Sequence, residues 1–345
     1  MNRSHQLLAA LLVLSSTRTS SEAATLKVPS AYPTIQSAIV AAAPGDTVRV
    51  APGTYHERVV IPSTKTGLRL RGTGKVILDA IGTGPGAIIA VDAAEARIEN
   101  LTLTHASSSG PDSGIGVWVL AGGAGTTIRD VNVIRAELHG ITLYPPSCVV
   151  RDCRIVGGRR GIAGHPGATD GLVTGCEVVR TLDYGIELMG DRARIEKNVI
   201  RGQSDNGAGI RIEGDDSIVA KNTIEGCNAG ILATMSSIRS VIRQNDVTAN
   251  RTYGLYVVGI ESRVEKNTIS NCATYGIRLA GDDPVVVGNV VEECGDGVEN
   301  NTPNSRFTKN IATKNRIDVA MSQAPASFEK NTYHSGGPTT PPEID

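Results

Sequence analysis

The chain has 345 residues, with 34 lysines and arginines against 35 aspartates and glutamates, so its formal net charge is −1. Without a basic excess it lacks the electrostatic attraction that drives binding to a phosphate backbone, and a nucleic-acid partner is excluded. Only 3% of the residues are aromatic and 39 are glycine, a composition typical of short strands joined by tight turns.

Residues 1–23 have the three parts of a secretory signal peptide. Arg3 gives a positive start, residues 7–14 form an apolar run, and small residues around Ala23 fit a cleavage site. The apolar run is too short to span a bilayer, and no later stretch is long and apolar enough to be a transmembrane segment. We therefore expect an exported protein, located in the periplasm or outside the cell.

Residues 24–65 are expected to form an N-terminal cap with the first strands. Ile35, Ala38, Ile39 and Ala42 follow the spacing i, i+3, i+4, i+7, which gives one apolar face of a helix. Such a helix can close the open end of a repetitive stack. The first strand is expected at residues 46–50.

A unit of about 22 residues recurs between residues 66 and 333. The segment GIELMGDRARIEKNVI returns as GIRIEGDDSIVAKNTI, GLYVVGIESRVEKNTI and GIRLAGDDPVVVGNVV. One anchor position in the unit is filled, at intervals of 21 to 24 residues, by Asn132, Cys153, Cys176, Asn198, Asn222, Asn245, Asn267, Asn289, Asn310 and Asn331. Short β-type units of this length cannot bury an apolar face alone, so they stack into a solenoid of about ten coils. A C-terminal tail is expected over residues 334–345.

The G-I-x-L…N-x-I pattern resembles the repeat of the pectate-lyase-like superfamily. That resemblance implies an all-β fold, a right-handed parallel β-helix solenoid with about 22 residues per coil, an N-terminal capping helix and a ladder of stacked asparagines. The cap segments TIQSAI, PGDTVRV and GTYHERVVI are similar to those of pectin methylesterases, NosD-type proteins and alginate-modifying enzymes. The catalytic motifs of these families, among them QDTL, WIDH and DPHD, are absent from the sequence.

Six cysteines in an exported chain are compatible with three disulfides. The repeat, however, stacks Cys153 on Cys176 and Cys272 on Cys294 in parallel, which is poor geometry for a bridge. We expect free, buried thiols.

Three aspartates occupy the equivalent turn of different units. Asp191, Asp215 and Asp282 each follow a repeat glycine by six residues. Aspartate favours turns because its side chain bonds nearby backbone. No metal site is predicted, although the same oxygens leave a calcium site open.

The outward positions of the G-I-x-L strands should form one continuous surface. The candidate catalytic residues on it are His165, Glu187, Arg211, Glu213 and Tyr144, and the candidate substrate-binding residues are Trp118, Tyr256 and Arg278. A uronate lyase or epimerase needs a base such as histidine and a cation that neutralises a carboxylate, whereas an inverting glycosidase needs two separated carboxyls. The alternative is an ion-paired surface without a site.

An insert, HASSSGPDSG, enlarges one coil. Because extra loops on a solenoid gather on its binding face, His105 and Asp112 are expected near the Trp118 end of the surface.

Two functions remain open from the sequence. The first is an exported carbohydrate-active enzyme (a lyase, epimerase or glycoside hydrolase) that acts on an acidic, uronate-containing polysaccharide. The second is a non-catalytic glycan-binding, accessory or surface protein. The enzyme is expected to need no cofactor, calcium excepted, and the protein is expected to be a monomer.

Overall fold

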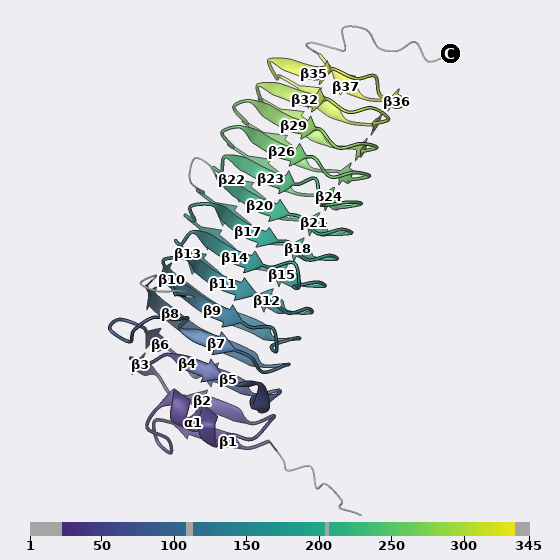
Figure 1. The fold of residues 1–345 in the computed structure, drawn as a ribbon. Helices are drawn as coiled ribbons and strands as arrows, with labels where there is room; N and C mark the ends of the chain where they lie inside the picture. Colours follow the sequence, from purple (N-terminus) through teal and green to yellow (C-terminus); the bar gives the residue numbers. More distant parts are fainter. Residues whose placement is uncertain (1–22, 108–112, 204–206, 335–345) are drawn as a thin grey trace, which may run out of the picture.

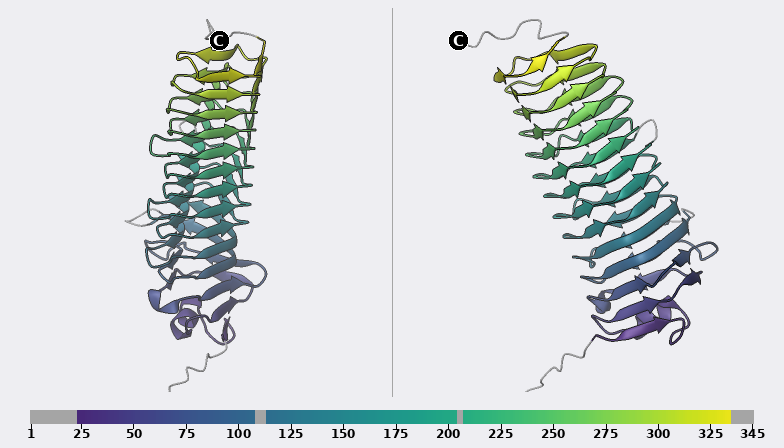
Figure 2. Two further views of the ribbon diagram at one scale, coloured as in Figure 1. Left: turned by 90° about the vertical axis from the view of Figure 1, so that its right-hand side faces the viewer. Right: turned by 180° about the vertical axis from the view of Figure 1, so that it is seen from behind.

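The computed structural model describes residues 23–107, 113–203 and 207–334. They form a β-solenoid of ~14 turns with ~22 residues per coil and one short helix, which confirms the expected fold but exceeds the ten coils counted from the anchors (Figure 1, Figure 2). The predicted signal peptide and C-terminal tail lie outside the described residues, apart from one residue of each. No helix of the described chain has the length and apolar character that a membrane crossing requires.

One sheet, here called the front sheet, carries the G-I-x-L strands (Figure 1). Its strands are parallel and pair in the order of the chain: β4 (Val59–Ile61), β7 (Ile89–Val91), β9 (Ile115–Val119), β11 (His139–Leu143), β14 (Arg160–Gly164), β17 (Tyr184–Leu188), β20 (Ala208–Ile212), β23 (Ala229–Ala233), β26 (Tyr253–Val257), β29 (Tyr275–Leu279), β32 (Asp296–Asn300) and β35 (Ile317–Met321).

Each coil continues through two further strand positions, also parallel to their neighbours. The first is held by β1 (Thr25–Val28), β2 (Thr47–Val50), β5 (Arg69–Gly72), β12 (Val149–Arg151), β15 (Leu172–Thr174), β18 (Arg194–Glu196), β21 (Ile218–Ala220), β24 (Val241–Arg243), β27 (Arg263–Glu265), β30 (Val285–Val287), β33 (Arg306–Thr308) and β36 (Ser327–Glu329). The second is held by β3 (Gly53–Tyr55), β6 (Val76–Asp79), β13 (Arg154–Val156), β16 (Glu177–Val179), β19 (Val199–Arg201), β22 (Thr223–Glu225), β25 (Asp246–Thr248), β28 (Thr268–Ser270), β31 (Val290–Glu292), β34 (Ile311–Thr313) and β37 (Thr332–Tyr333). The long strands β8 (Arg97–Ala106) and β10 (Thr127–Ala136) run through both positions.

The capping helix is confirmed as α1 (Ile35–Ala41), which buries Ile35, Ala38 and Ile39 against the first coils. Thr34 begins it with a capping box, since its side chain accepts from the Ser37 backbone. A 3₁₀ turn, η1 (Ser63–Lys65), follows β4. The expected first strand is wrong by one coil, because β1 precedes the helix and pairs with β2. Its four residues are too few to give a periodic signal.

The repeat glycine that opens each G-I-x-L strand faces the core, as the following isoleucine does. A Cβ at Gly140 would lie 2.6 Å from the Ile155 side chain, and one at Gly185 would lie 2.6 Å from Ile200. Strict inward and outward alternation therefore fails at the start of the strand. The residue before each glycine, such as His139, joins the outward surface.

The asparagine ladder is confirmed. Each amide from Asn198 to Asn310 donates its Nδ2 to the next anchor's Oδ1, over 2.9 to 3.0 Å, along the series Asn198, Asn222, Asn245, Asn267, Asn289, Asn310 and Asn331. The anchor at Asn132 is wrong by one residue: Asn132 is exposed and pairs with Arg154, so Val131 lies beneath Cys153.

All six cysteines are free and buried, as expected. Cys227 and Cys294 belong to a second ladder, in which their backbone N–H groups donate to the side-chain Oδ1 atoms of Asn250 and Asn315.

Two of the three aspartates of the recurrent turn bond the backbone of the next coil rather than that of their own turn, whereas Asp282 accepts from the Thr302 hydroxyl. Asp191 Oδ1 accepts from the Asp215 N–H at 2.9 Å, and Asp215 Oδ1 accepts from the Ile238 N–H at 2.9 Å. These carboxylates tie each turn to the next coil.

Candidate functional site

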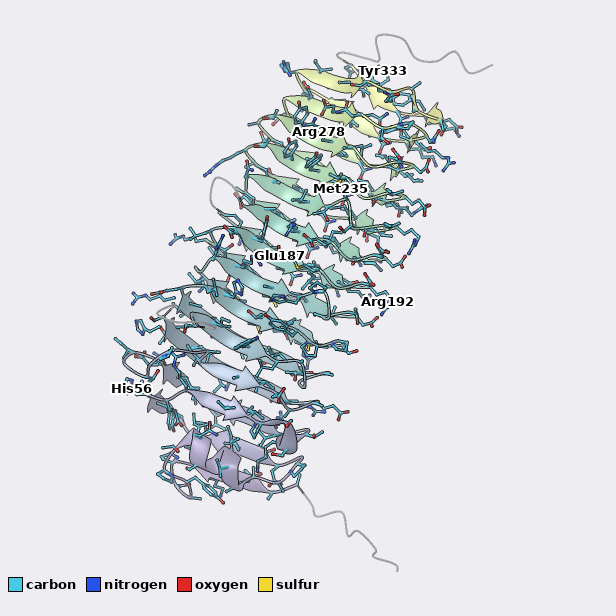
Figure 3. The ribbon with its side chains drawn as sticks, viewed as in Figure 1. His56, Glu187, Arg192, Met235, Arg278 and Tyr333 are labelled. Carbon is cyan, nitrogen blue, oxygen red and sulfur yellow. The ribbon has the colours of Figure 1, made fainter. Side chains whose placement is uncertain are left out.

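The outward surface of the front sheet carries a paired-charge network of Arg160, Glu187, Arg211 and Glu213, of which Figure 3 labels Glu187. Glu187 is 1% exposed and lies 2.7 Å from Arg160, while Arg211 pairs with both Glu187 and Glu213. Tyr184 lies between the two guanidiniums, whose carbons are 5.6 and 5.1 Å from its ring centre. The Arg211 guanidinium is thus already neutralised by protein carboxylates.

An aromatic stack lies beside this network. His165 stacks on Tyr144 with ring centres 3.9 Å apart, and Trp118 lies 6.1 Å from Tyr144. Burial, together with the charge of Arg160, lowers the pKa of His165, and Glu187 opposes the effect. The stack offers a ring surface to solvent through Tyr144, which is 38% exposed.

A tyrosine cluster lies farther along the same surface, around Arg278, which is labelled in Figure 3. Tyr253 stacks on Tyr256 and Tyr275, with ring centres 4.8 and 5.5 Å apart. Arg278 lies against all three rings and pairs with Glu299 at 2.8 Å. Such half-buried rings suit contact with the faces of sugars.

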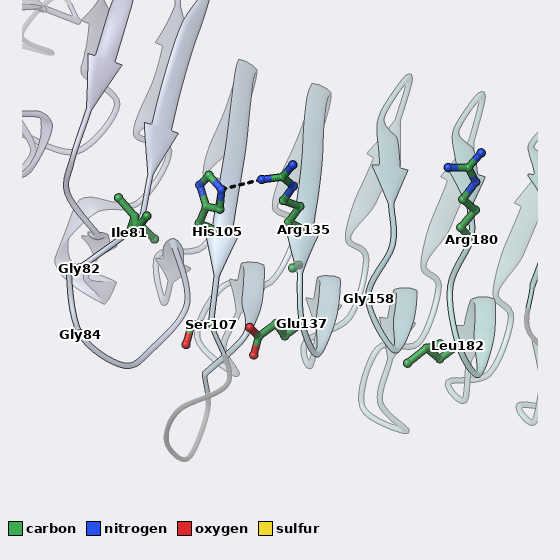
Figure 4. Close-up of a pocket in the computed structure, with 12 residues that line it drawn as sticks. Ile81, Gly82, Gly84, His105, Ser107, Arg135, Glu137, Gly158, Arg180 and Leu182 are labelled. Carbon is green, nitrogen blue, oxygen red and sulfur yellow. Dashed lines mark hydrogen bonds between the residues drawn. The ribbon is translucent and has the colours of Figure 1, made fainter.

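A groove of about 870 Å³ lies elsewhere, along the turns that lead into the front sheet (Figure 4). We call it the turn groove. It crosses the coils that end in β6, β8, β10, β13 and β16, and the residues along it include Ile81, His105, Arg135, Gly158, Arg180 and Leu182. Its volume is in the range of small-molecule sites. Because Gly158 and Leu182 precede Arg160 and Tyr184 by two residues, the groove borders the front sheet.

The wall of the turn groove holds a chain of three polar side chains. His105 Nδ1 lies 2.8 Å from Asp79 Oδ1, and its Nε2 lies 3.1 Å from an Arg135 guanidinium nitrogen (Figure 4). Since a guanidinium only donates, Nε2 accepts, and the proton is assigned to Nδ1, which donates to Asp79. His105 is therefore a neutral imidazole whose basic nitrogen faces a cation.

Asp79 is held in its ionised form. Partial burial alone would raise the pKa of this carboxyl, but the hydrogen bonds that it accepts from the Ile81 N–H and from His105 outweigh burial, so its pKa is lowered. An ionised Asp79 both fixes the tautomer of His105 and stabilises the imidazolium that forms when Nε2 takes a proton.

Arg180 lies two coils beyond Arg135 along the same groove. Its backbone N–H donates to the Arg201 carbonyl, whereas its exposed side chain makes no hydrogen bond or ion pair with any described residue. It is thus a cation with capacity for an anionic ligand.

The structure brings the sequence-predicted residues together in three groups rather than one. Glu187, Arg211 and Glu213 pair with each other; Trp118, Tyr144 and His165 stack; Tyr256 and Arg278 join the tyrosine cluster. Of the insert residues, His105 lies in the turn groove and Asp112 is outside the described residues. The sequence analysis did not identify Arg135 and Arg180 as site residues. The signal that could have found them is their shared place in the repeat, four residues after the inward anchor position that Val131 and Cys176 occupy.

Two family models match the chain. The model described as "Periplasmic copper-binding protein (NosD)" matches residues 45–232, more than half of the chain. The model described as "Right handed beta helix region" matches residues 168–310 and 259–333. No curated protein sequence matches the chain.

Solved structures of alginate-modifying enzymes share the fold. The periplasmic alginate epimerase AlgG superposes with a TM-score of 0.59 at 16% identity, over 84% of this chain and 77% of AlgG. The A-module of the mannuronan C-5 epimerase AlgE4 from Azotobacter vinelandii gives 0.59 at 17% identity, over 88% and 95%. The PL6 family alginate lyase AlyGC gives 0.60 at 16% identity, over 94% and 53%. At these identities the likeness extends to the fold alone.

The described histidines, cysteines and acidic residues form no cluster that fits a copper ion. Copper is held by thiolate, thioether and imidazole ligands. The six thiols are buried in the core, and both ring nitrogens of His105 already have partners. Among the described residues no group of three histidine, cysteine or acidic side chains is arranged to hold a metal.

Proposed function

The chain belongs to the NosD family of periplasmic β-helix proteins, and we propose that it is an exported protein that binds an acidic polysaccharide and abstracts a proton from its uronate residues. The observation that carries this proposal is the arrangement at the turn groove, where a neutral, carboxylate-held imidazole faces a guanidinium. To remove a proton from the carbon next to a carboxylate, an enzyme needs a base and a cation that binds this carboxylate.

Substrate binding would itself release the base. The uronate carboxylate would take the N–H groups of Arg135 in a two-point contact, and the guanidinium would then leave His105 Nε2 with a free lone pair. Partial neutralisation of the carboxylate also favours the carbanion that forms beside it. The two residues therefore act in sequence, with Arg135 binding first.

The chemical step balances without an oxidant or a reductant. The C5–H bond of the uronate breaks, its proton passes to His105 Nε2, and the electron pair spreads into the carboxylate held by Arg135. Either the C4–O bond then breaks, with the pair forming a C4=C5 double bond and the leaving O4 taking up the proton from His105 Nε2, or a proton from water adds to C5 on the opposite face and His105 returns its own proton to solvent. The first outcome is a lyase reaction and the second an epimerase reaction.

Alginate, the uronate polymer named for the structural neighbours, is the first substrate to test. Export supports the choice, since the family description names the periplasm and residues 1–23 read as a signal peptide.

The proposal is tested by hydrogen exchange at C5. Polymannuronate, polyguluronate and polygalacturonate are incubated with the protein in D₂O, and NMR follows loss of the C5 proton while ultraviolet absorbance follows unsaturated product. Exchange registers proton abstraction whichever product forms. We expect His105→Asn, whose side chain tolerates the positive φ of 59° at this position, to lower the rate about 10²- to 10⁴-fold.

His165→Asn is the matched variant on the front sheet, where the sequence placed the base. We expect it to keep the wild-type exchange rate. Exchange that survives His105→Asn and disappears in His165→Asn would move the chemistry to the aromatic stack, and no exchange on any of the three polymers would refute the proposal.

A second candidate is glycan binding without chemistry, carried by the tyrosine cluster. Its three rings and Arg278 form a platform suited to a sugar face. In that case Tyr256→Ala would weaken polysaccharide binding and no C5 exchange would occur.

A further inference from the structure

The turn groove contains a row of equivalent positions that the sequence repeat does not reveal by itself. His105, Arg135, Gly157 and Arg180 lie opposite one another in successive coils, as the pairing of the residues before them shows. All four have a left-handed backbone, with φ values of 59°, 59°, 77° and 59°. Equal backbone conformations at stacked positions project side chains in the same direction. The side chains of His105, Arg135 and Arg180 therefore all extend toward the groove.

The row has a gap between its two guanidiniums. Gly157 has no side chain, and a Cβ built there would meet no atom within 4 Å. Its neighbour Gly158 lines the groove, and a Cβ there would lie 2.8 Å from the Ala136 carbonyl oxygen, so the backbone itself forms the floor. Arg135 and Arg180 therefore flank an open space one coil wide (Figure 4).

The spacing of Arg135 and Arg180 matches the length of a disaccharide unit in a polymer. Two coils correspond to about 9.6 Å at the usual separation of parallel strands. A disaccharide in an extended 1,4-linked chain has about this length, and in such a chain every second sugar turns its carboxylate to the same side. A polymer lying along the solenoid axis would thus present one carboxylate to each guanidinium.

We propose that Arg180 is a second carboxylate-binding residue, which holds the uronate two sugars away from the one bound at Arg135. The middle sugar lies over Gly157 and Gly158, beside the exposed Leu182. This inference rests on the substrate class proposed above and adds to it a minimum length of three sugars. It also adds a specificity, since only the carboxylates on alternate sugars are contacted.

The test compares binding of oligomers that differ by one sugar. Di-, tri- and tetramers of 1,4-mannuronate and of 1,4-galacturonate are titrated into the protein by calorimetry, with the His105→Asn background used wherever wild type converts the oligomer. We expect a gain in affinity of about tenfold from dimer to trimer, as a second charge-assisted contact gives. Arg180→Gln should remove this gain and leave dimer affinity unchanged.

Two controls lie at the same turn position outside the groove. Lys314 has the same φ of 59°, so Lys314→Gln tests whether loss of any cation in this row has the same effect; we expect none. Gly157→Asp places a carboxylate in the gap and should abolish the gain, whereas Gly226→Asp, at an equivalent positive φ, should not.

Equal affinity of wild type for dimer and trimer, or a gain that persists in Arg180→Gln, would overturn the inference. The result is independent of the exchange experiment. An affinity gain that depends on Arg180, without any C5 exchange, would support this binding site and refute the proposed proton abstraction. C5 exchange without the affinity gain would support the proton abstraction and refute the binding site.

Discussion

His139 shows how strongly the position of a side chain on the coil changes its pKa. It precedes a repeat glycine, so it lies at the edge of the front sheet, where its Nδ1 is 2.9 Å from the Thr142 hydroxyl. Burial, together with the charges of Arg160 and His165, lowers the pKa of His139 from 6.5 to about 4. It is therefore neutral in the folded protein at neutral pH.

This shift predicts a loss of stability in mild acid. Between pH 6.5 and about 4 the unfolded chain protonates His139 and the folded chain does not, so stability falls as the pH is lowered through this window, by an amount on the order of 1–3 kcal/mol. His139→Asn should flatten the fall in melting temperature between pH 7 and pH 4. His334→Asn, an exposed control, should follow wild type; a His139→Asn curve as steep as wild type would contradict the assignment.

The candidate cation Arg135 was hidden by a single residue of misalignment, whereas the candidate base His105 was named in the sequence only as part of an insert. With the anchor placed at Asn132, the position four residues later is Ala136; with Val131, it is Arg135, which faces His105. The sequence alone favoured Asn132 because asparagine fills most other anchors. Likewise, the pairing of Arg211 with two carboxylates depends on side-chain rotamers, which a repeat pattern does not determine.

At the level of the elements, the regular part of the fold could be predicted because every coil repeats the same constraints. Two constraints recur at fixed spacing. One is a glycine where a Cβ would clash with a core side chain, such as Gly140 beside Ile155, and the other is an asparagine whose side chain bonds the next asparagine, such as Asn245 to Asn267. β1 was missed because a four-residue strand carries no such recurrence, and the second ladder was missed because Cys, Asn, Gln and Thr all occupy it.

The asparagine ladder makes a definite prediction about stability. Asn245 Oδ1 accepts from the backbone and the side chain of Asn222, and its Nδ2 donates to the Val219 carbonyl and to Asn267. Asn245→Leu leaves these buried groups without partners and should destabilise by about 1–3 kcal/mol for each. Chemical denaturation measures the change.

Thr268→Leu is the matched control, because it introduces the same side chain at an exposed strand position next to the ladder. We expect it to unfold near the wild-type midpoint. Equal midpoints for Asn245→Leu and wild type would mean that the ladder contributes nothing.

At the level of the whole molecule, the buried thiols report on unfolding. They lie in coils between residues 148 and 294, and burial raises the pKa of Cys148 to about 11 and that of Cys227 to about 12. Thiolate is the reactive form, so the native Cys148 and Cys227 thiols should be inert at pH 8. All six should react together when the protein unfolds.

Thiol titration with and without denaturant, under non-reducing conditions, checks this prediction. Fewer than six reactive thiols in the unfolded chain would reveal a disulfide. Reaction of some thiols well before the circular dichroism signal changes would instead show that part of the solenoid opens independently.

The ladder of amides also has a consequence for how such a molecule changes its size over evolutionary time. Each amide from Asn198 to Asn331 bonds only the coils directly before and after it. Duplication or loss of one whole coil in this stretch therefore leaves every remaining amide with an equivalent partner, whereas loss of half a coil does not. The turn groove lies before this stretch, so relatives can lengthen or shorten their C-terminal half by whole coils while the spacing from His105 to Arg180 is inherited intact.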